Sequence, residues 1–551
     1  MIKRILTTIL AIIAIALSAS AYDFMAGNLC YNINDDGKTA TVTYESASLP
    51  SFSGPAYSAL SGSVTIPSKV ASGGVTYTVT GIGNRAFIGC TGLTSVTFPN
   101  SIISIGEYAF YGCSGISSVT LPPNLTSIES YVFQNCSAMK SITIPSTVTS
   151  IGREAFTDCS SLASIDLPAS VTSISVWAFA RCSSLSSFVI PQGVKSIGYN
   201  LFYQCTGLKS VTIPATVSII GSEAFYGCTA LTSIDIPAAV TWIGSAAFSQ
   251  CTALTAVNIS DLAAWCGIRF DSVGANPLSV AHNLYLNGTK VENVSIPSTV
   301  TKIRDYAFSG GSNFTGIAIP ATVTEIGQRA FNDCTGLESI VVPTSVTTVG
   351  RNAFAGCSGL KTMKWDARTC PDQIPYVPST LPLNGLTGLT SIEFGHQVER
   401  IPRGLCYGLI GLKNVTIGRA VSFIGADAFS GCTSLERVSA YPAPDKITLK
   451  GGAAVFTDVP RAACELHVVP VYEADYRAAD VWKDFSPIIG DLVVIDGDLN
   501  DDGSVDSSDV AILLEMVLAG GIVPIAADIN ADGALDSSDV SILLEMVLGG
   551  E

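Results

Sequence analysis

The sequence predicts a mainly β solenoid of 23-residue coils, followed by a small α-helical module. Three observations lead to this fold class. Cysteines recur at a strict interval of 23 residues, and a phenylalanine stands three positions before each of them. The chain then ends in two matching acidic loops thirty residues apart, each followed by an apolar segment. A fixed period of this length is typical of stacked coils that share one core. The regular cysteines are Cys90, Cys113, Cys136, Cys159, Cys182, Cys205, Cys228 and Cys251.

Residues 1–21 have the pattern of a secretory signal peptide. Basic Lys3 and Arg4 precede an apolar run from Ile5 to Leu17, and a small-residue site ends at Ala21. This pattern predicts cleavage after Ala21 and a secreted protein associated with the cell surface. Because no later apolar stretch reaches the length of about 20 residues that a membrane span needs, we expect no transmembrane anchor.

Residues 22–60 are predicted to form an N-terminal β cap. Asp35-Asp36-Gly37 stands before the alternating run Thr39–Tyr44, which indicates a hairpin. Such a cap is needed because a bare terminal coil would expose the core and a strand edge.

The repeats occupy residues 61–436, and the copy from Leu208 to Cys228 shows their sequence pattern. Leu208, Val211 and Ile213 alternate with polar residues, which predicts a short strand that Pro214 ends. Val217 to Gly221 predicts a second extended stretch with a corner at glycine. The Ala-Phe-x-x-Cys segment is expected to close the coil through a helical turn.

The regular period is interrupted twice. Residues 261–293 are an insertion, and residues 364–386 are irregular. In the coil at 401–411, Cys406 takes the phenylalanine position and Leu409 the cysteine position. Such changes usually map to one face of a solenoid, where partner contact is expected. Residues 437–490, with Trp482 and Phe485, are predicted to form a C-terminal cap.

Residues 491–551 are predicted to form a helical module with two calcium loops. Oxygen-bearing side chains at loop positions 1, 3, 5, 9 and 12 can surround a hard cation, and glycine at position 6 permits the sharp turn. Position 12 is Asp in both loops, one methylene shorter than the usual Glu. The alternative is an acidic, disordered tail. The candidate calcium-ligand positions are Asp498, Asn500, Asp502, Ser504, Asp506 and Asp509 in the first loop, and Asp528, Asn530, Asp532, Ala534, Asp536 and Asp539 in the second.

Both parts of the chain resemble known families. The 23-residue pattern resembles the BspA-type bacterial leucine-rich repeat of secreted and surface proteins, which implies adhesion. The loop-then-helix pair resembles a type I dockerin, which implies two Ca²⁺ ions and docking to a cohesin domain of a scaffoldin-like protein. The family's leading partner contacts fall at loop positions 10 and 11. Here those positions are Ser507, Ser508, Ser537 and Ser538.

The net charge of −16 belongs almost wholly to the C-terminal module. From Asp484 to Glu551 the chain holds 15 acidic residues and no Lys or Arg, which leaves 30 acids against 29 bases elsewhere. Neither part has the basic surface that nucleic-acid binding needs, so we expect no nucleic-acid partner.

Nothing in the sequence indicates catalysis. The three histidines, His282, His396 and His467, stand in separate contexts without a neighbouring nucleophile, and no nucleotide-binding, esterase or metalloprotease motif occurs. We therefore predict a protein that is not an enzyme. The ladder of eleven cysteines is predicted to consist of free, buried thiols, because a cysteine that repeats at a core position behaves as a small apolar residue. Disulfides remain the alternative.

Aromatic residues near the phenylalanine column are a candidate ligand surface. Tyr203 and Tyr226 follow two of the phenylalanines, and Trp242 stands where most coils have Ser or Thr. If these side chains point outward, they form a track that could stack on sugars or anchor a protein. The alternative is that they shield the corners of the coils.

The sequence thus predicts an exported, non-catalytic binding or adhesion protein. Its repeats would bind a protein or carbohydrate ligand, and its calcium-bound dockerin would dock to a cohesin-bearing scaffold. One alternative is a subunit, catalytic or not, of a polysaccharide-degrading complex. The other is a structural surface protein with a calcium-stabilised end cap.

Overall fold

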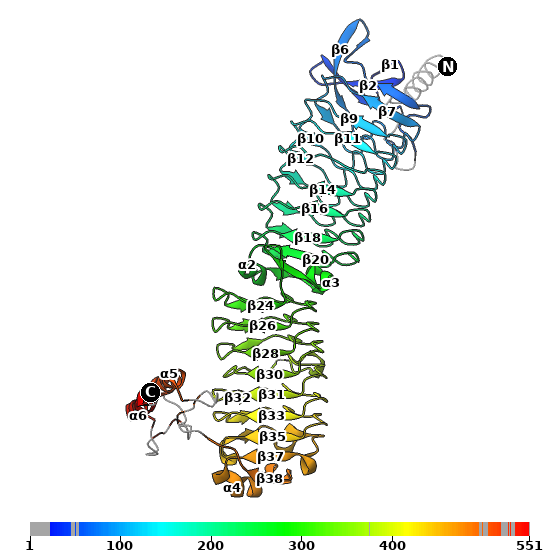
Figure 1. The fold of residues 1–551 in the computed structure, drawn as a ribbon. Coiled ribbons are helices and arrows are strands. Elements are labelled where there is room, and N and C mark those ends of the chain that lie inside the picture. Colours follow the sequence, from blue (N-terminus) through cyan, green and yellow to red (C-terminus); the bar gives the residue numbers. More distant parts are fainter. Residues whose placement is uncertain are drawn as a thin grey trace, which may run out of the picture. The chain divides into compact units, whose positions relative to one another are not determined.

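The computed structural model describes residues 22–45, 50, 54–373, 375–494, 497, 499, 505–519, 527, 529 and 535–549. The chain divides into two compact units: residues 1–264 with 268–288, and residues 265–267 with 289–551. Within each unit, short parallel strands from successive coils stack into ladders (Figure 1). The predicted β solenoid is confirmed, with a core of inward-facing Leu, Val, Ile, Phe and Cys side chains.

Most 23-residue coils of the first unit contribute one strand to each of two ladders. The first ladder starts from the parallel pair β4–β7. Later strands also pair in parallel, for example at Ser141 and Ser118. Its strands are β4 (Gly62–Thr65), β7 (Leu93–Thr97), β9 (Ser118–Thr120), β11 (Ser141–Thr143), β14 (Ser187–Val189), β16 (Ser210–Thr212), β18 (Ser233–Ile236), β20 (Ala256–Ile259) and β22 (Leu284–Leu286).

The second ladder of this unit consists of two-residue strands. The outer residue of each strand faces solvent, and the inner residue, usually Ile, is buried. Its strands are β8 (Ser104–Ile105), β10 (Ser127–Ile128), β12 (Ser150–Ile151), β13 (Ser173–Ile174), β15 (Ser196–Ile197), β17 (Ile219–Ile220), β19 (Trp242–Ile243) and β21 (Arg269–Phe270).

A six-stranded sheet lies at the N-terminal end of the first unit. The hairpin expected at Asp35–Gly37 is present, because β2 and β3 pair antiparallel around it. Asp36 accepts the backbone N–H groups of Lys38 and Thr39 at 2.8 Å each, which closes the turn. The sheet contains β1 (Phe24–Ala26), β2 (Leu29–Ile33), β3 (Thr39–Thr43), β5 (Lys69–Ser72) and β6 (Val75–Ile82), and β8 pairs with β6.

The second unit repeats the two-ladder plan. Its larger sheet has nine strands: β24 (Asn293–Ser295), β26 (Gly316–Ala318), β28 (Ser339–Val342), β30 (Thr362–Trp365), β31 (Ser391–Phe394), β33 (Asn414–Ile417), β35 (Arg437–Ala440), β37 (Glu465–Val468) and β38 (Ile488–Gly490). The two-residue strands are β25 (Lys302–Ile303), β27 (Glu325–Ile326), β29 (Thr348–Val349), β32 (Arg400–Ile401), β34 (Phe423–Ile424) and β36 (Thr448–Leu449).

The segment from 261 to 293 forms an enlarged coil. Its strand β21 pairs with β19, and its strand β22 pairs with β20, so both ladders of the first unit continue through it. The extra length is taken up by α2 (Leu262–Cys266), the 3₁₀ turn η1 (Val273–Ala275) and α3 (Leu278–Ala281), and β23 (Thr289–Lys290) follows β22.

The irregular segment at 364–386 is held by two arginines from the next coil. Asp372 forms an ion pair with Arg400 at 2.7 Å, and it accepts a hydrogen bond from the backbone N–H of Arg403 at 2.7 Å. The guanidinium of Arg403 lies 3.7 Å from the ring centroid of Tyr376, a cation–π contact. Irregularity starts only after Trp365, since β30 keeps the ladder register, and it includes η2 (Pro378–Thr380).

Residues 437–490 place an aromatic cluster against the last coils. Phe456 stacks on Phe429 at 5.5 Å and meets Trp482 and Phe485 edge-on. Tyr476, on α4 (Glu473–Ala478), packs edge-on against Trp482 and donates a hydrogen bond to the carbonyl of Pro442 at 2.8 Å. The 3₁₀ turns here are η3 (Pro444–Lys446), η4 (Gly452–Phe456), η5 (Arg461–Ala463), η6 (Pro470–Tyr472) and η7 (Trp482–Asp484).

Two features of the coil differ from the sequence expectations. The Ala-Phe-x-x-Cys segment is a series of hydrogen-bonded turns rather than a helix, because its first residues bond to the next coil: the N–H of Phe156 donates to the carbonyl of Ala178. The corner glycines serve close packing rather than unusual dihedrals. A Cβ on Gly221 would lie 2.7 Å from the backbone nitrogen of Tyr199 in the preceding coil.

Candidate functional site

The C-terminal module contains two helices of thirteen residues, α5 (Ser507–Ala519) and α6 (Ser537–Gly549). Leu513 and Leu543, one from each helix, are fully buried together with Leu499 and Ala527. The predicted helical module is therefore present. Its core includes Leu499 from the first predicted loop, and Ile529 from the second packs against it.

The Asp at position 12 of each loop is buried and ties its loop together. Asp509 accepts the backbone N–H of Leu499 at 2.7 Å with one carboxylate oxygen, and that of Asp506 at 2.9 Å with the other. Asp539 does the same, with Ile529 at 2.9 Å and Asp536 at 3.0 Å. Both Asp side chains have no exposed surface. The two loops thus share one arrangement.

The Asp at position 9 of each loop lies at the start of the helix. The hydroxyl and the backbone N–H of Ser508 donate to Asp506 at 2.6 and 2.7 Å, and Ser538 does the same to Asp536. These hydrogen bonds lower the pKa of the Asp506 and Asp536 carboxyls and so favour their ionised form. The serine hydroxyl has the larger effect, and the backbone N–H the smaller.

The described carboxylates fit a hard cation. Asp509 and Asp539 each bring to the loop a carboxylate, which has about four lone-pair sites. Burying an ionised carboxylate is costly unless hydrogen bonds and a cation compensate it. The other predicted ligand positions lie outside the described residues: Asp498, Asn500, Asp502, Ser504, Asp528, Asn530, Asp532 and Ala534.

The predicted partner-contact serines are exposed. Ser507, Ser508, Ser537 and Ser538 form the first turns of α5 and α6, and the hydroxyls of Ser508 and Ser538 already donate to the loop aspartates. The structure adds apolar residues that the sequence reasoning did not single out. Leu514 and Leu518 on α5 and Leu544 and Leu548 on α6 are exposed. The sequence could have predicted this exposure, because each of these leucines stands one or five residues after the buried Leu513 or Leu543 and therefore lies on another face of the helix.

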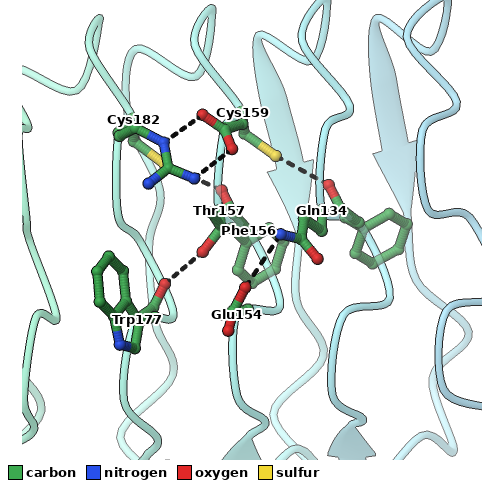
Figure 2. Close-up of polar contacts among 10 residues, drawn as sticks. Gln134, Glu154, Phe156, Thr157, Cys159, Trp177 and Cys182 are labelled. Atoms are coloured by element: carbon green, nitrogen blue, oxygen red, sulfur yellow. Dashed lines mark hydrogen bonds and ion pairs between the residues drawn. The ribbon is translucent and has the colours of Figure 1, made fainter.

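Polar contacts fix the outer corner of the repeats. In Figure 2, Gln134 donates to Glu154 at 3.0 Å, and the hydroxyl of Thr157 donates to the carbonyl of Trp177 at 2.6 Å. Arg181 binds Asp158 in the preceding coil with two hydrogen bonds of 2.7 and 2.6 Å. Bidentate pairs of this kind hold neighbouring coils in register.

The aromatic residues of this corner stack mostly on one another. Tyr108 and Tyr131 lie face to face at 4.4 Å, and Tyr203 and Tyr226 at 5.2 Å. This arrangement uses the ring faces that a continuous aromatic track would offer to a ligand, and it favours a packing role for these pairs. Trp242 lies apart from them, on the second ladder.

The three histidines lie in separate surroundings. His467 is buried on β37, with its Nδ1 2.8 Å from Asp491 and its Nε2 3.0 Å from Glu465. Burial, followed by the charges of Lys364 and Arg419, lowers the pKa of His396 to about 4. His282 caps the end of α3 with a left-handed backbone and donates its N–H to Leu278.

Within the described part of the chain, no helix combines the length and the apolar character that crossing a membrane requires. The same residues contain no group of three or more His, Cys, Asp or Glu side chains arranged to hold a metal ion.

Stacked parallel coils followed by a paired-helix module define a solenoid repeat protein with a small helical C-terminal module. Family comparison specifies both parts. A model of the BspA type leucine rich repeat region matches residues 67–186, 177–265, 279–371 and 383–450, and a model of the dockerin type I domain matches residues 496–548. The chain belongs to the BspA-type leucine-rich repeat family and carries a type I dockerin, a class of domain that binds calcium.

Solved structures include several similar proteins. A leucine-rich repeat protein from Bacteroides ovatus has 23% identity and a TM-score of 0.46, with 78% of this chain and 99% of that chain covered. A leucine rich cell surface protein from Faecalibacterium prausnitzii has 28% identity and a TM-score of 0.37, with 77% and 96% covered. A leucine-rich repeat protein from T. pallidum has 30% identity and a TM-score of 0.33, with 38% and 90% covered. No curated protein matches the chain.

Proposed function

We propose that this chain is an exported, non-catalytic binding protein with two separate binding parts. The repeats hold a protein or glycan ligand, and the dockerin attaches the molecule to a cohesin domain of a scaffold outside the cell. The membership in the BspA-type family and the type I dockerin domain support this division of labour.

The observation that carries the proposal is the duplicated arrangement of Asp509 and Asp539. Each buried carboxylate gathers two backbone N–H groups of its loop at the start of a helix. Two Ca²⁺ ions, one in each loop, would compensate the buried charge and hold the loops folded, since calcium prefers oxygen ligands of this kind. The exposed serines and leucines of α5 and α6 are then the proposed cohesin contacts.

Binding of the full-length protein to a panel of immobilised type I cohesins tests the proposal. We expect binding in calcium that is lost in a chelator and lost in the double variant Asp509→Ala/Asp539→Ala. Asp475→Asn removes an exposed acidic residue of α4 and serves as the matched control. Failure of the wild-type protein to bind any cohesin in calcium would contradict the docking function.

A further inference from the structure

The second ladder of the first unit changes character over three consecutive coils. From β8 to β15 its outward residue is Ser in all five strands. In β17, β19 and β21 the same position holds Ile219, Trp242 and Arg269, which pair side by side in the parallel sheet. The ladder therefore presents an apolar, an aromatic and a cationic side chain in sequence on one solvent-facing surface.

Tyr199 joins this surface from the coil of β15. Its ring lies 6.2 Å from the ring of Trp242 at an interplanar angle of 81°, so the two rings form a right-angled corner. Tyr199 is 48% exposed and Ile219 is 37% exposed. In the face-to-face pairs Tyr108–Tyr131 and Tyr203–Tyr226 each ring has one face against its partner, whereas an edge-to-face contact occupies at most one face of one ring.

A charged pair fixes the corner and borders it. The indole N–H of Trp242 donates to one oxygen of Asp271 at 2.9 Å, and the Nε of Arg269 contacts the other oxygen at 3.0 Å. The indole is therefore held in a defined orientation. The side chain of Arg269 is 74% exposed, and four of its five N–H donors remain beyond the Nε contact.

We propose that the corner of Tyr199, Trp242, Arg269 and Asp271 binds a pyranose ring of a neutral polysaccharide. The C–H face of a pyranose is apolar and stacks on an aromatic face, while its hydroxyl groups both donate and accept hydrogen bonds. Arg269 supplies the donors, and the remaining lone pairs of Asp271 accept. This assignment rests on the proposed ligand-binding role of the repeats and names its ligand class.

The surroundings favour a sugar over other partners. Exposed hydroxyl residues, Ser196 and Thr241, flank the corner, whereas a protein hot spot lies inside a well-packed apolar patch. A phosphate or sulfate ligand is disfavoured because Asp271 pairs with Arg269 and offsets its charge. The bordering charges thus complement hydroxyl groups rather than a net charge.

Affinity electrophoresis of the full-length protein tests this site, with gels that contain hydroxyethylcellulose, xyloglucan, arabinoxylan or galactomannan. We expect at least one polysaccharide to retard the wild-type protein. Trp242→Ala and Tyr199→Ser should weaken that binding at least tenfold, while Tyr199→Phe retains it. Tyr203→Ala is the matched control, because Tyr203 lies in a stacked pair outside the corner.

The outcomes separate this site from the docking function. Thermal unfolding and cohesin binding of each variant, measured in parallel, show that its fold and its dockerin are intact. The proposal is overturned if no polysaccharide retards the wild-type protein, or if folded Trp242→Ala and Tyr199→Ser bind like wild type. If the wild-type protein binds a polysaccharide but no cohesin, the result contradicts the docking function alone.

Discussion

Each regular coil of the first unit has two left-handed backbone positions, and one of them is of particular interest. It lies two residues before the phenylalanine, and glycine does not occupy it in the first unit. Its residues, all with φ between 53° and 64°, are Arg85, Tyr108, Tyr131, Glu154, Trp177, Asn200, Glu223 and Ala246. Non-glycine residues rarely adopt this conformation, and the turn here imposes it.

Replacing Ala246 by Gly should therefore stabilise its coil. The substitution removes a left-handed strain of roughly 1 kcal/mol at the loss of a single methyl group. We expect a higher midpoint of thermal unfolding. Ala247→Gly is the matched control: the neighbouring Ala247 is fully buried and has no positive φ, so this change should destabilise the protein. A lower midpoint for Ala246→Gly would contradict the strain argument.

Asp366 makes stability depend on pH. Burial, only partly offset by Lys364, raises its pKa to about 6 from an ordinary value of 3.8, and its Oδ1 has no hydrogen-bond partner among the described residues. Because the pKa of Asp366 is higher in the folded protein, its protonation stabilises the fold. This stabilisation is fully present below pH 3.8 and is lost as the pH rises through about 6. At neutral pH the ionised side chain is therefore destabilising.

Asp366→Asn should raise the unfolding midpoint at pH 8, and the gain should disappear near pH 4, where wild-type Asp366 is protonated. Thermal unfolding across this pH range measures the effect. Asp166→Asn, at an exposed position, is the control and should show no such pH-dependent gain. An equal gain for Asp366→Asn at both pH values would disprove the role of ionisation.

At the scale of the element, phenylalanines and cysteines form two parallel columns in the core. In the first unit the phenylalanine rings stack from Phe87 to Phe248 at 5.1 to 6.2 Å. The thiol of Cys159 donates to the carbonyl of Phe133 in the preceding coil at 3.1 Å, as Figure 2 shows, and other ladder cysteines repeat the contact. The predicted free, buried thiols are present throughout the ladder.

The ladder cysteines should be unreactive in the folded protein. Burial raises the pKa of Cys205 to about 12, so almost no reactive thiolate forms at pH 8. Alkylation followed by mass spectrometry should label none of the eleven ladder thiols in the native state and all of them after denaturation without reductant. Ladder cysteines that stay unlabelled after denaturation would reveal disulfides instead.

The regular coil was predictable because its side chains follow a strict period. Alternation within Leu208–Ile213 and the buried Phe225 and Cys228 needed only that pattern. The enlarged coil at 261–293 was not predictable, because its strands β21 and β22 lack the repeat spacing and are placed by pairing with β19 and β20. Trp242 was singled out from the sequence, but its contact with Tyr199 was not, since the two residues come from separate coils.

At the scale of the whole molecule, the two helices of the C-terminal module were predictable from its duplicated motif. The loop positions predicted Asp509 and Asp539 as calcium ligands, and the structure shows both as buried hydrogen-bond acceptors. Their calcium binding stays a prediction. The spacing of the motif did not predict that these carboxylates accept hydrogen bonds from the backbone N–H groups at loop positions 2 and 9. Those bonds depend on how the loop folds over the start of the helix.

We propose that calcium in two equivalent loops folds the dockerin, through which this repeat protein would attach to a cohesin-bearing scaffold. Calorimetric titration of calcium into the metal-free full-length protein tests it most directly. We expect two bound ions per chain, one in the Asp509→Ala variant and none in Asp509→Ala/Asp539→Ala. No calcium binding by the wild-type chain, or wild-type stoichiometry in the double variant, would contradict the account.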